Sequence, residues 1–144
     1  MRRVGPLIAS GRDADVYEYG EHLVLRRART GRSMALEARV MEHVRSEGYP
    51  VPRIEDVSAD GSELVMERVV GPSMLEDITR RPWTLRRHGA SLARLHVELH
   101  ELGAPAWLSP FATAPGERIG HYDLHPVNVL MSPTKDLISV ENAA

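Results

Sequence analysis

The sequence predicts an α+β protein in which a five-stranded antiparallel sheet with one helix precedes a mainly helical region. Short apolar segments with strand character fill most of residues 1–70, and a long helical pattern follows over residues 84–102. Glycine or proline stands near most of the expected boundaries. We therefore expect two units, residues 1–70 and residues 71–144.

Composition and charge exclude several classes of protein. The chain has 42% hydrophobic and 26% charged residues, which is typical of a globular protein. Its net charge of -2 gives no electrostatic reason to expect a nucleic acid or an anionic membrane as partner. The absence of cysteine excludes disulfides and thiolate metal sites. No segment has the apolar character of a signal peptide or the ~18 apolar residues of a membrane helix, so we expect a cytoplasmic protein.

Three strands are expected first, at residues 4–9, 15–19 and 22–28. The polar turn SGRD separates the first two, and a tight connection at Gly20 separates the second from the third. Links this short favour an antiparallel meander.

A helix is expected next, with Ser33 as N-cap and Gly48 as stop signal. Glu37 lies on the same helical stripe as the apolar residues. An acid on an apolar face needs a partner, because an unpaired buried charge is costly. The apolar stripe consists of Leu36, Val40, Met41 and Val44.

Two more strands, residues 52–58 and 63–70, are joined by the turn ADGS. Gly71 and Pro72 then mark the exit from the first unit, and residues 73–79 are expected to form a short helix. The first unit thus has the order β-β-β-α-β-β.

The second unit is mainly helical. Thr84 is predicted to cap a helix that ends before Gly103, and residues 103–118 are expected to be a loop. Residues 129–131 and 137–140 are expected to form a small hairpin. The apolar stripe of the long helix consists of Leu85, Leu92, Leu95, Leu99 and Leu102.

The segment HYDLHPVNVL, residues 121–130, carries the chemistry. Pro126 prevents a regular helix there. A fixed carboxylate such as Asp123 on a loop can take or orient the proton of a hydroxyl, and His121 can brace the loop. The side-chain oxygen of Asn128 suits Mg²⁺, which binds oxygen ligands together with phosphate. The spacing H-x-D-x-x-x-x-N before an apolar strand indicates a catalytic loop.

This segment resembles the catalytic loop of aminoglycoside phosphotransferase-type enzymes, which have the protein-kinase-like fold. The resemblance implies ATP and Mg²⁺ as cofactors and transfer of the ATP γ-phosphate to a hydroxyl of a small, aminoglycoside-like molecule. Asp123 would be the catalytic base with His121 beside it, and Asn128 would be a metal ligand. Complete members of this family are longer, so we expect a truncated C-terminal lobe.

The resemblance also assigns a phosphate site in the N-terminal lobe. SGRDADVY is similar to the turn that covers the phosphates, with Gly11 in the turn and Val16 packing over the adenine. LVLR is similar to a strand that normally ends in lysine. Arg26 would therefore contact the α- and β-phosphates, and Glu37 would hold Arg26.

MERV, residues 66–69, resembles the hinge that holds the adenine. The carbonyl of Glu67 and the N–H of Val69 would meet the adenine edge, and Met66 would line the back of the pocket.

One position departs from the family pattern. Family members carry a second metal-binding aspartate after the asparagine, and Ser139 stands there in this chain. If that contact is worth ~4 kcal/mol, its loss slows the reaction roughly a thousandfold. Asp136 or Glu141 replaces it only after a register shift. The alternative function is therefore a catalytically inactive nucleotide-binding remnant or a gene fragment.

Other interpretations stay open beside these. Asp123 and Asn128 can be turn-forming residues, and Arg26 can belong to a solvated strand edge. Two histidine pairs, His121 with His125 and His96 with His100, have the i, i+4 spacing of some zinc helices. The basic segment RRPWTLRR is expected to be exposed rather than to bind nucleic acid.

A truncated lobe has one further consequence. The leucine stripe of residues 85–102 would form an exposed apolar patch larger than the ~300–600 Å² of a typical monomer. We therefore expect possible self-association through this surface.

Overall fold

The structure, a computed structural model, describes residues 3–102, 107, 129–131 and 138–139. His121, Asp123 and Asn128 lie outside the described residues, and so does most of the predicted loop.

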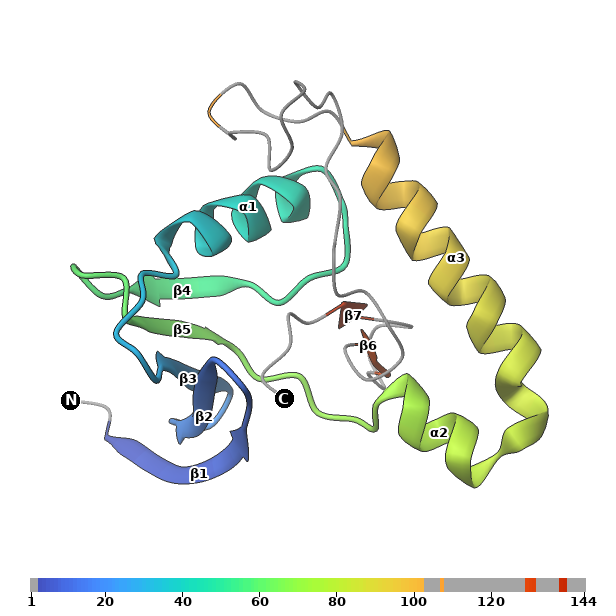
Figure 1. Cartoon of the computed structure of the whole chain (residues 1–144), viewed down its shortest axis with the longest axis horizontal. Coiled ribbons are helices and arrows are strands. Elements are labelled where there is room, and N and C mark those ends of the chain that lie inside the picture. Colours follow the sequence, from blue (N-terminus) through green and yellow to red (C-terminus); the bar gives the residue numbers. More distant parts are fainter. Residues whose placement is uncertain (1–2, 103–106, 108–128, 132–137, 140–144) are drawn as a thin grey trace.

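A five-stranded antiparallel sheet forms the N-terminal half (Figure 1). The strand order is β1-β2-β3-β5-β4, with every neighbouring pair antiparallel. The five predicted strands are confirmed, but the last two are shorter than expected. The strands are β1 (Val4–Ser10), β2 (Ala14–Tyr19), β3 (Leu23–Ala28), β4 (Ile54–Val57) and β5 (Glu63–Glu67).

Successive side chains of β3 point to opposite faces of this sheet. Val24 and Ala28 pack with the large core, which also contains α1 (Ala35–Ser46). Leu23 and Leu25 pack with Val65 in a small cluster on the other face. Because the period is two, position 26 shares the face of positions 24 and 28.

Helix α1 begins one residue later than predicted. Met34, not Ser33, is the N-cap, and no side chain caps it, although the Ser33 hydroxyl oxygen accepts a hydrogen bond from the Ala35 N–H at 3.3 Å. Gly48, at φ +89°, follows the helix end as expected. The predicted apolar stripe is wrong at Leu36, which is 56% exposed. The core face consists of Ala38, Met41 and Val44.

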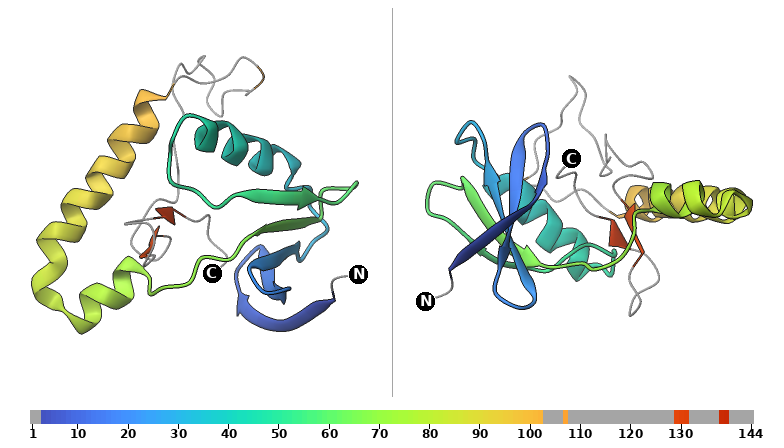
Figure 2. Two further views of the ribbon diagram at one scale, coloured as in Figure 1. Left: turned by 180° about the vertical axis from the view of Figure 1, so that it is seen from behind. Right: turned by 90° about the horizontal axis from the view of Figure 1, so that it is seen from below.

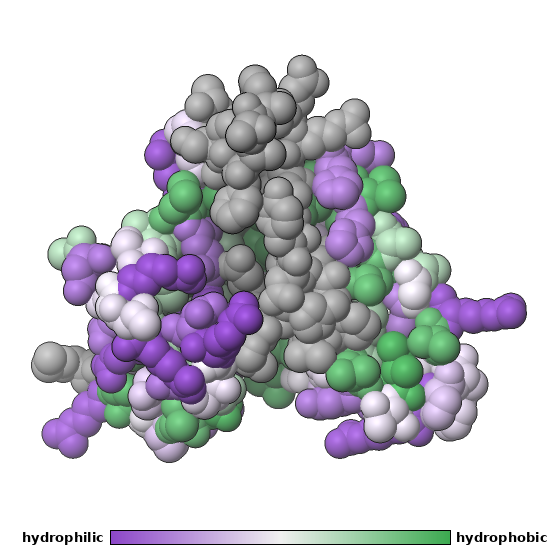
Figure 3. Space-filling model, in the orientation of Figure 1, coloured by the Kyte–Doolittle hydropathy of each residue, from purple (hydrophilic) through white to green (hydrophobic). Residues whose placement is uncertain are grey.

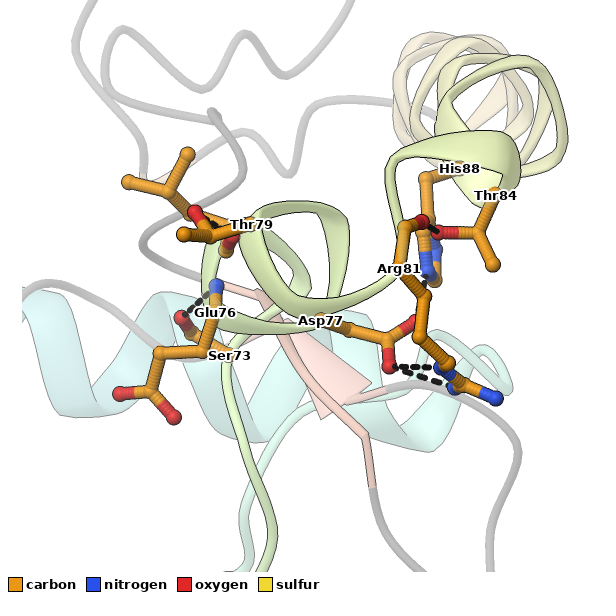
Figure 4. Close-up of polar contacts among 8 residues, drawn as sticks. Ser73, Glu76, Asp77, Thr79, Arg81, Thr84 and His88 are labelled. Carbon is orange, nitrogen blue, oxygen red and sulfur yellow. Dashed lines mark hydrogen bonds and ion pairs between the residues drawn. The ribbon is translucent and has the colours of Figure 1, made fainter.

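Two helices follow the sheet: α2 (Met74–Arg80) and α3 (Leu85–Glu101), joined by the 3₁₀ turn η1 (Pro82–Thr84). The Ser73 hydroxyl caps α2 by accepting from the Glu76 N–H at 3.1 Å (Figure 4). Thr84 is the N-cap of α3, as predicted, but its side chain makes no capping hydrogen bond. This residue is helical, and its hydroxyl donates backwards to the Arg81 carbonyl at 2.7 Å.

The leucine stripe of α3 is largely covered. Leu95 and Leu99 are buried in the large core with Met74, so the predicted exposed patch is wrong for them. Leu85 is exposed, and the buried residue at the start of α3 is His88. Exposed hydrophobic side chains remain near the corner between α2 and α3 (Figure 3), and self-association there stays a prediction.

The predicted hairpin is present as β6 (Val129–Leu130) and β7 (Ile138–Ser139), which are antiparallel and shorter than expected. Figure 1 and Figure 2 place it between the sheet and the α2–α3 pair. A β-bridge joins Leu130 to Ser73, and the Met131 N–H donates to the Pro72 carbonyl at 2.9 Å. The hairpin is therefore attached where the chain leaves the sheet.

Across the part of the chain that the structure describes, no helix is both long and apolar enough to cross a membrane.

Candidate functional site

A cavity of about 350 Å³ lies between the sheet and the segment that leaves β5. Strand register brings its walls together. Val16 is opposite Arg26, and Val24 is opposite Met66, all on the same face of the sheet. The thirteen lining residues are Ile8, Ala9, Val16, Val24, Arg26, Pro52, Met66, Glu67, Arg68, Val69, Val70, Gly71 and Leu130.

Arg26 is the buried cation of this cavity, at 5% exposure. Its Nη1 is hydrogen-bonded to Oε1 of Glu37, whose side chain is 16% exposed. The pair joins β3 to α1, and it provides the partner that an acid on the inner side of α1 needs. A guanidinium that stays charged at a cavity wall favours an anionic ligand such as phosphate.

The segment after β5 forms a second wall. Glu67 ends the strand, and its backbone N–H donates to the Arg53 carbonyl at 2.8 Å. Val69 and Val70, which follow, line the cavity. Arg68 also lines it and pairs with Glu18 at 3.3 Å. This wall thus presents the aliphatic side chains of Val69 and Val70 beside two charged residues, and an apolar surface of this kind suits a flat heterocycle.

Leu130 brings the C-terminal hairpin to the same cavity. It lies two residues after Asn128 in the sequence. The strand that follows the predicted catalytic loop therefore reaches the cavity that Arg26 lines.

Most of the predicted nucleotide residues are brought together. Five line the cavity: Val16, Arg26, Met66, Glu67 and Val69. Glu37 lies behind Arg26. Gly11 is not among the lining residues. It is buried in the turn between β1 and β2, where its N–H donates to the Ala14 carbonyl at 2.8 Å.

A polar cluster holds the turn that contains Gly11. Asp15 accepts from the Ser10 hydroxyl at 2.6 Å and from Nη2 of Arg29 at 2.9 Å. These bonds, first that of Arg29 and then that of Ser10, lower the pKa of Asp15. The Arg29 N–H also donates to the Asp13 carbonyl at 3.0 Å, so the residue that follows β3 is bonded to the turn through both its backbone and its side chain.

Sequence reasoning missed several lining residues. Val24 could have been found, because period two places it on the face of Arg26. Leu130 could have been found as the apolar residue just beyond Asn128. Ile8, Pro52 and Arg68 carry no sequence signal, since only the sheet order and the path of residues 67–71 bring them to the cavity.

A second polar cluster joins α2 to α3. Nε2 of His88 lies 2.6 Å from Oδ2 of Asp77, and Nε of Arg81 donates to Oδ1 of Asp77 at 2.8 Å. The hydrogen bond from His88, followed by that from Arg81, lowers the pKa of Asp77. All three side chains point toward one another at the turn between the helices (Figure 4).

The alternative prediction of a zinc site at His96 and His100 would need a third ligand, and the described residues offer none. Their rings are 6.2 Å apart, but among the described residues no group of three or more His, Asp or Glu could hold a metal ion. His121 and His125 lie outside the described residues.

The family is established by comparison with known proteins. Residues 5–115 match the model of the phosphotransferase enzyme family. This range covers more than half of the chain, so the chain belongs to that family. It includes the five-stranded sheet except for Val4, helices α1 to α3 and every predicted nucleotide-binding residue, and it ends before residues 121–130. No curated protein gives a significant match.

Two predictions are confirmed by this result. The protein is a phosphotransferase by family, of the type that the resemblance indicated. The five-stranded antiparallel sheet with its helices is the predicted α+β, protein-kinase-like architecture.

Proposed function

We propose that the cavity binds ATP and that the chain transfers the γ-phosphate to a hydroxyl of a small, aminoglycoside-like molecule. The observation that carries this proposal is the buried Arg26–Glu37 pair at the wall of a cavity that is lined mainly by apolar residues. The volume of about 350 Å³ falls in the range of roughly 300–1,000 Å³ of ligand pockets.

In this proposal the adenine lies between Val16 and Met66, with its edge against the backbone of Glu67 and Val69. Arg26 meets the α- and β-phosphates, and Glu37 keeps its guanidinium in place. Residues 1–70 thus form the nucleotide-binding unit, and residues 71–144 complete the site with the catalytic loop.

The reaction is a phosphoryl transfer. The acceptor oxygen forms a bond to the γ-phosphorus as the bond between that phosphorus and the β–γ bridging oxygen breaks, which releases ADP. Asp123 takes the proton of the acceptor hydroxyl, and His121 orients the loop. Positioning and charge supply most of the acceleration.

Mg²⁺ would accompany the nucleotide, with the side-chain oxygen of Asn128 as a ligand. When bound, it would neutralise phosphate charge. The family's second ligand position is Ser139, whose neutral hydroxyl is a weaker ligand than a carboxylate.

The backbone register favours a second candidate function, nucleotide binding with impaired or no turnover. Ser139 is paired across the hairpin with Val129, the residue next to Asn128. Position 139 is the one that corresponds to the family's second metal-binding aspartate, and it is a serine in this chain.

Calorimetry with ATP and MgCl₂ tests the binding site. Arg26→Met should weaken ATP binding by roughly 10- to 100-fold, as expected for lost charge-assisted hydrogen bonds. Arg27→Met is the matched control, because Arg27 lies on the opposite face of β3 and pairs with Glu63 at 2.7 Å. Equal ATP affinity in the two variants would contradict the proposed site.

Turnover separates the two candidate functions. ADP release would be measured with a panel of aminoglycosides and amino alcohols, in the parent and in Asp123→Asn. Acceptor-dependent release that the substitution abolishes supports the transferase, whereas ATP binding without release in the parent supports the second candidate.

A further inference from the structure

Helix α1 is contacted on two opposite sides. On its inner side, Glu37 holds Arg26 at the cavity wall. At ~100° per residue, Arg39 and His43 lie ~200° and ~240° around the helix axis from Glu37. These two residues therefore face the side of α1 opposite to Glu37.

Trp107 covers that outer side. Cζ of Arg39 lies 4.0 Å from the centroid of the Trp107 ring, well within the ~6 Å of a cation–π contact. The rings of His43 and Trp107 meet edge to face, with centroids 6.1 Å apart and an interplanar angle of 88°. One indole thus contacts two residues one helical turn apart.

Tertiary contacts must set the orientation of α1. A helix of 12 residues is marginal by itself, and no side chain caps its N-terminus. Its core face is formed by the small or flexible residues Ala38, Met41 and Val44. Such a face resists rotation about the helix axis weakly, because it presents little large, rigid surface.

The C-terminal end of α1 is already fixed. The Tyr49 hydroxyl, just beyond the helix, donates to the Leu95 carbonyl of α3 at 3.2 Å, and Tyr49 is buried. Residue 107 follows α3 in the chain, so α3 and Trp107 together hold α1 from its end and from its outer side. Rotation of α1 would move Glu37 away from Arg26.

We propose that Trp107 is a positioning residue: by contacting Arg39 and His43 it fixes the rotation of α1, so that Glu37 keeps Arg26 directed at the cavity. This inference rests on the proposed nucleotide site. It makes Trp107 act on ATP affinity through Glu37, without contact with the nucleotide.

A double-mutant cycle tests the route through Glu37. Trp107→Ala should weaken ATP binding about tenfold when residue 37 is glutamate, and should have little further effect in Glu37→Gln. Trp107→Phe keeps a ring and should stay within a few-fold of the parent. An equal loss in both backgrounds, or no loss in either, overturns the inference.

Hydrogen exchange gives a readout that does not need ATP. Trp107→Ala should lower the protection of amides in residues 35–46 more than that of the paired strands β3 and β5. Unchanged protection of α1 overturns the inference. If the parent binds no ATP, the proposed nucleotide site fails, while the exchange result still decides whether Trp107 positions α1.

Two matched variants control for general damage. Trp83→Ala removes the other tryptophan, which is 77% exposed, and should leave both ATP affinity and α1 protection unchanged. If Trp107→Ala fails to fold, Arg39→Ala removes the same cation–π contact, and Arg39→Lys should restore most of the ATP affinity. An Arg39→Ala variant identical to the parent in both measurements also overturns the inference.

Discussion

Asp77 of α2 and His88 of α3 are in direct contact, with Nε2 of His88 2.6 Å from Oδ2 of Asp77, and both residues are buried. This contact lies at the turn where the chain passes from α2 into α3. Arg81, which is more exposed, pairs with the same carboxylate (Figure 4). The angle between α2 and α3 therefore depends on one carboxylate that accepts from two partners.

Replacing Asp77 should make the free energy of unfolding less dependent on pH in the acidic range. Its pKa lies below the ordinary 3.8 because His88 and then Arg81 donate to it. Its contribution to the free energy of unfolding is therefore complete above pH 3.8 and is lost as the pH falls through the lower, folded-state pKa. Asp77→Asn should be less stable than the parent at pH 6, and the two should converge toward pH 2, as measured by thermal unfolding.

Glu76→Gln is the control for this experiment, because Glu76 is an exposed acid one position away on α2. It should follow the parent at both pH values. A difference between Asp77→Asn and the parent that stays constant with pH would show that the carboxylate contributes through packing alone.

The close approach of Ser33 to Gly61 should make position 61 intolerant of any side chain. Gly61 has φ +74°, and a Cβ placed there would lie 2.1 Å from the Ser33 hydroxyl oxygen and 3.2 Å from the Ser33 Cα. Gly31 has φ +69° with nothing within 4 Å of its Cβ position. Gly31→Ala should therefore cost the ~1–2 kcal/mol of a left-handed conformation, and Gly61→Ala should cost at least ~1 kcal/mol more. Urea unfolding measures both, and equal costs would show that the turn moves away from α1 freely.

The turn before β5 should lose stability at low pH, when Asp60 becomes protonated. Its carboxylate accepts from the Ser62 N–H at 3.0 Å and from the hydroxyls of Ser58 and Ser62 at 2.8 Å. These bonds, that of the Ser62 N–H first, lower the pKa of Asp60 to about 2. The stabilisation is present above pH 3.8 and is lost as the pH falls toward 2.

An NMR titration of the Asp60 carboxyl checks this expectation directly. Ser62→Ala removes one hydroxyl donor but keeps the backbone donor, so it should raise the pKa only partway toward 3.8. A titration midpoint near 3.8 in the parent would contradict the described turn.

Position 139 should control the dependence of nucleotide binding on Mg²⁺. Ser139 is paired with Val129, which follows Asn128 in the sequence, and in the proposed site an aspartate at position 139 would add a carboxylate ligand. Ser139→Asp should increase the ratio of ATP affinity with and without Mg²⁺ by about tenfold or more, and should raise turnover. Ser139→Asn has nearly the same shape without the charge and should change neither. A similar gain in both variants would exclude a metal role for this position.

Local chemistry in the sequence was enough to predict the elements of this protein. Period-two alternation identified the five strands, Gly48 ended α1, and the position of Glu37 on an otherwise apolar stripe predicted a charged partner. These features act over a few residues, so a linear pattern contains them. Caps were less predictable. Thr84 is the N-cap of α3 as expected, but its side chain makes no capping hydrogen bond, and α1 has Met34 rather than Ser33 as its N-cap.

Only the tertiary structure decided which residues meet. His88 is buried because Asp77, on another helix, offers it a hydrogen bond, and no local pattern contains that pairing. Leu36 is exposed although it follows the helical period, because the sheet meets α1 along Ala38, Met41 and Val44. The cavity likewise needs the sheet order, which places Val16 beside Arg26, and the bridge from Ser73 that brings in Leu130. Local propensity fixes how the backbone bends, whereas burial and charge pairing between distant residues depend on the whole packed chain.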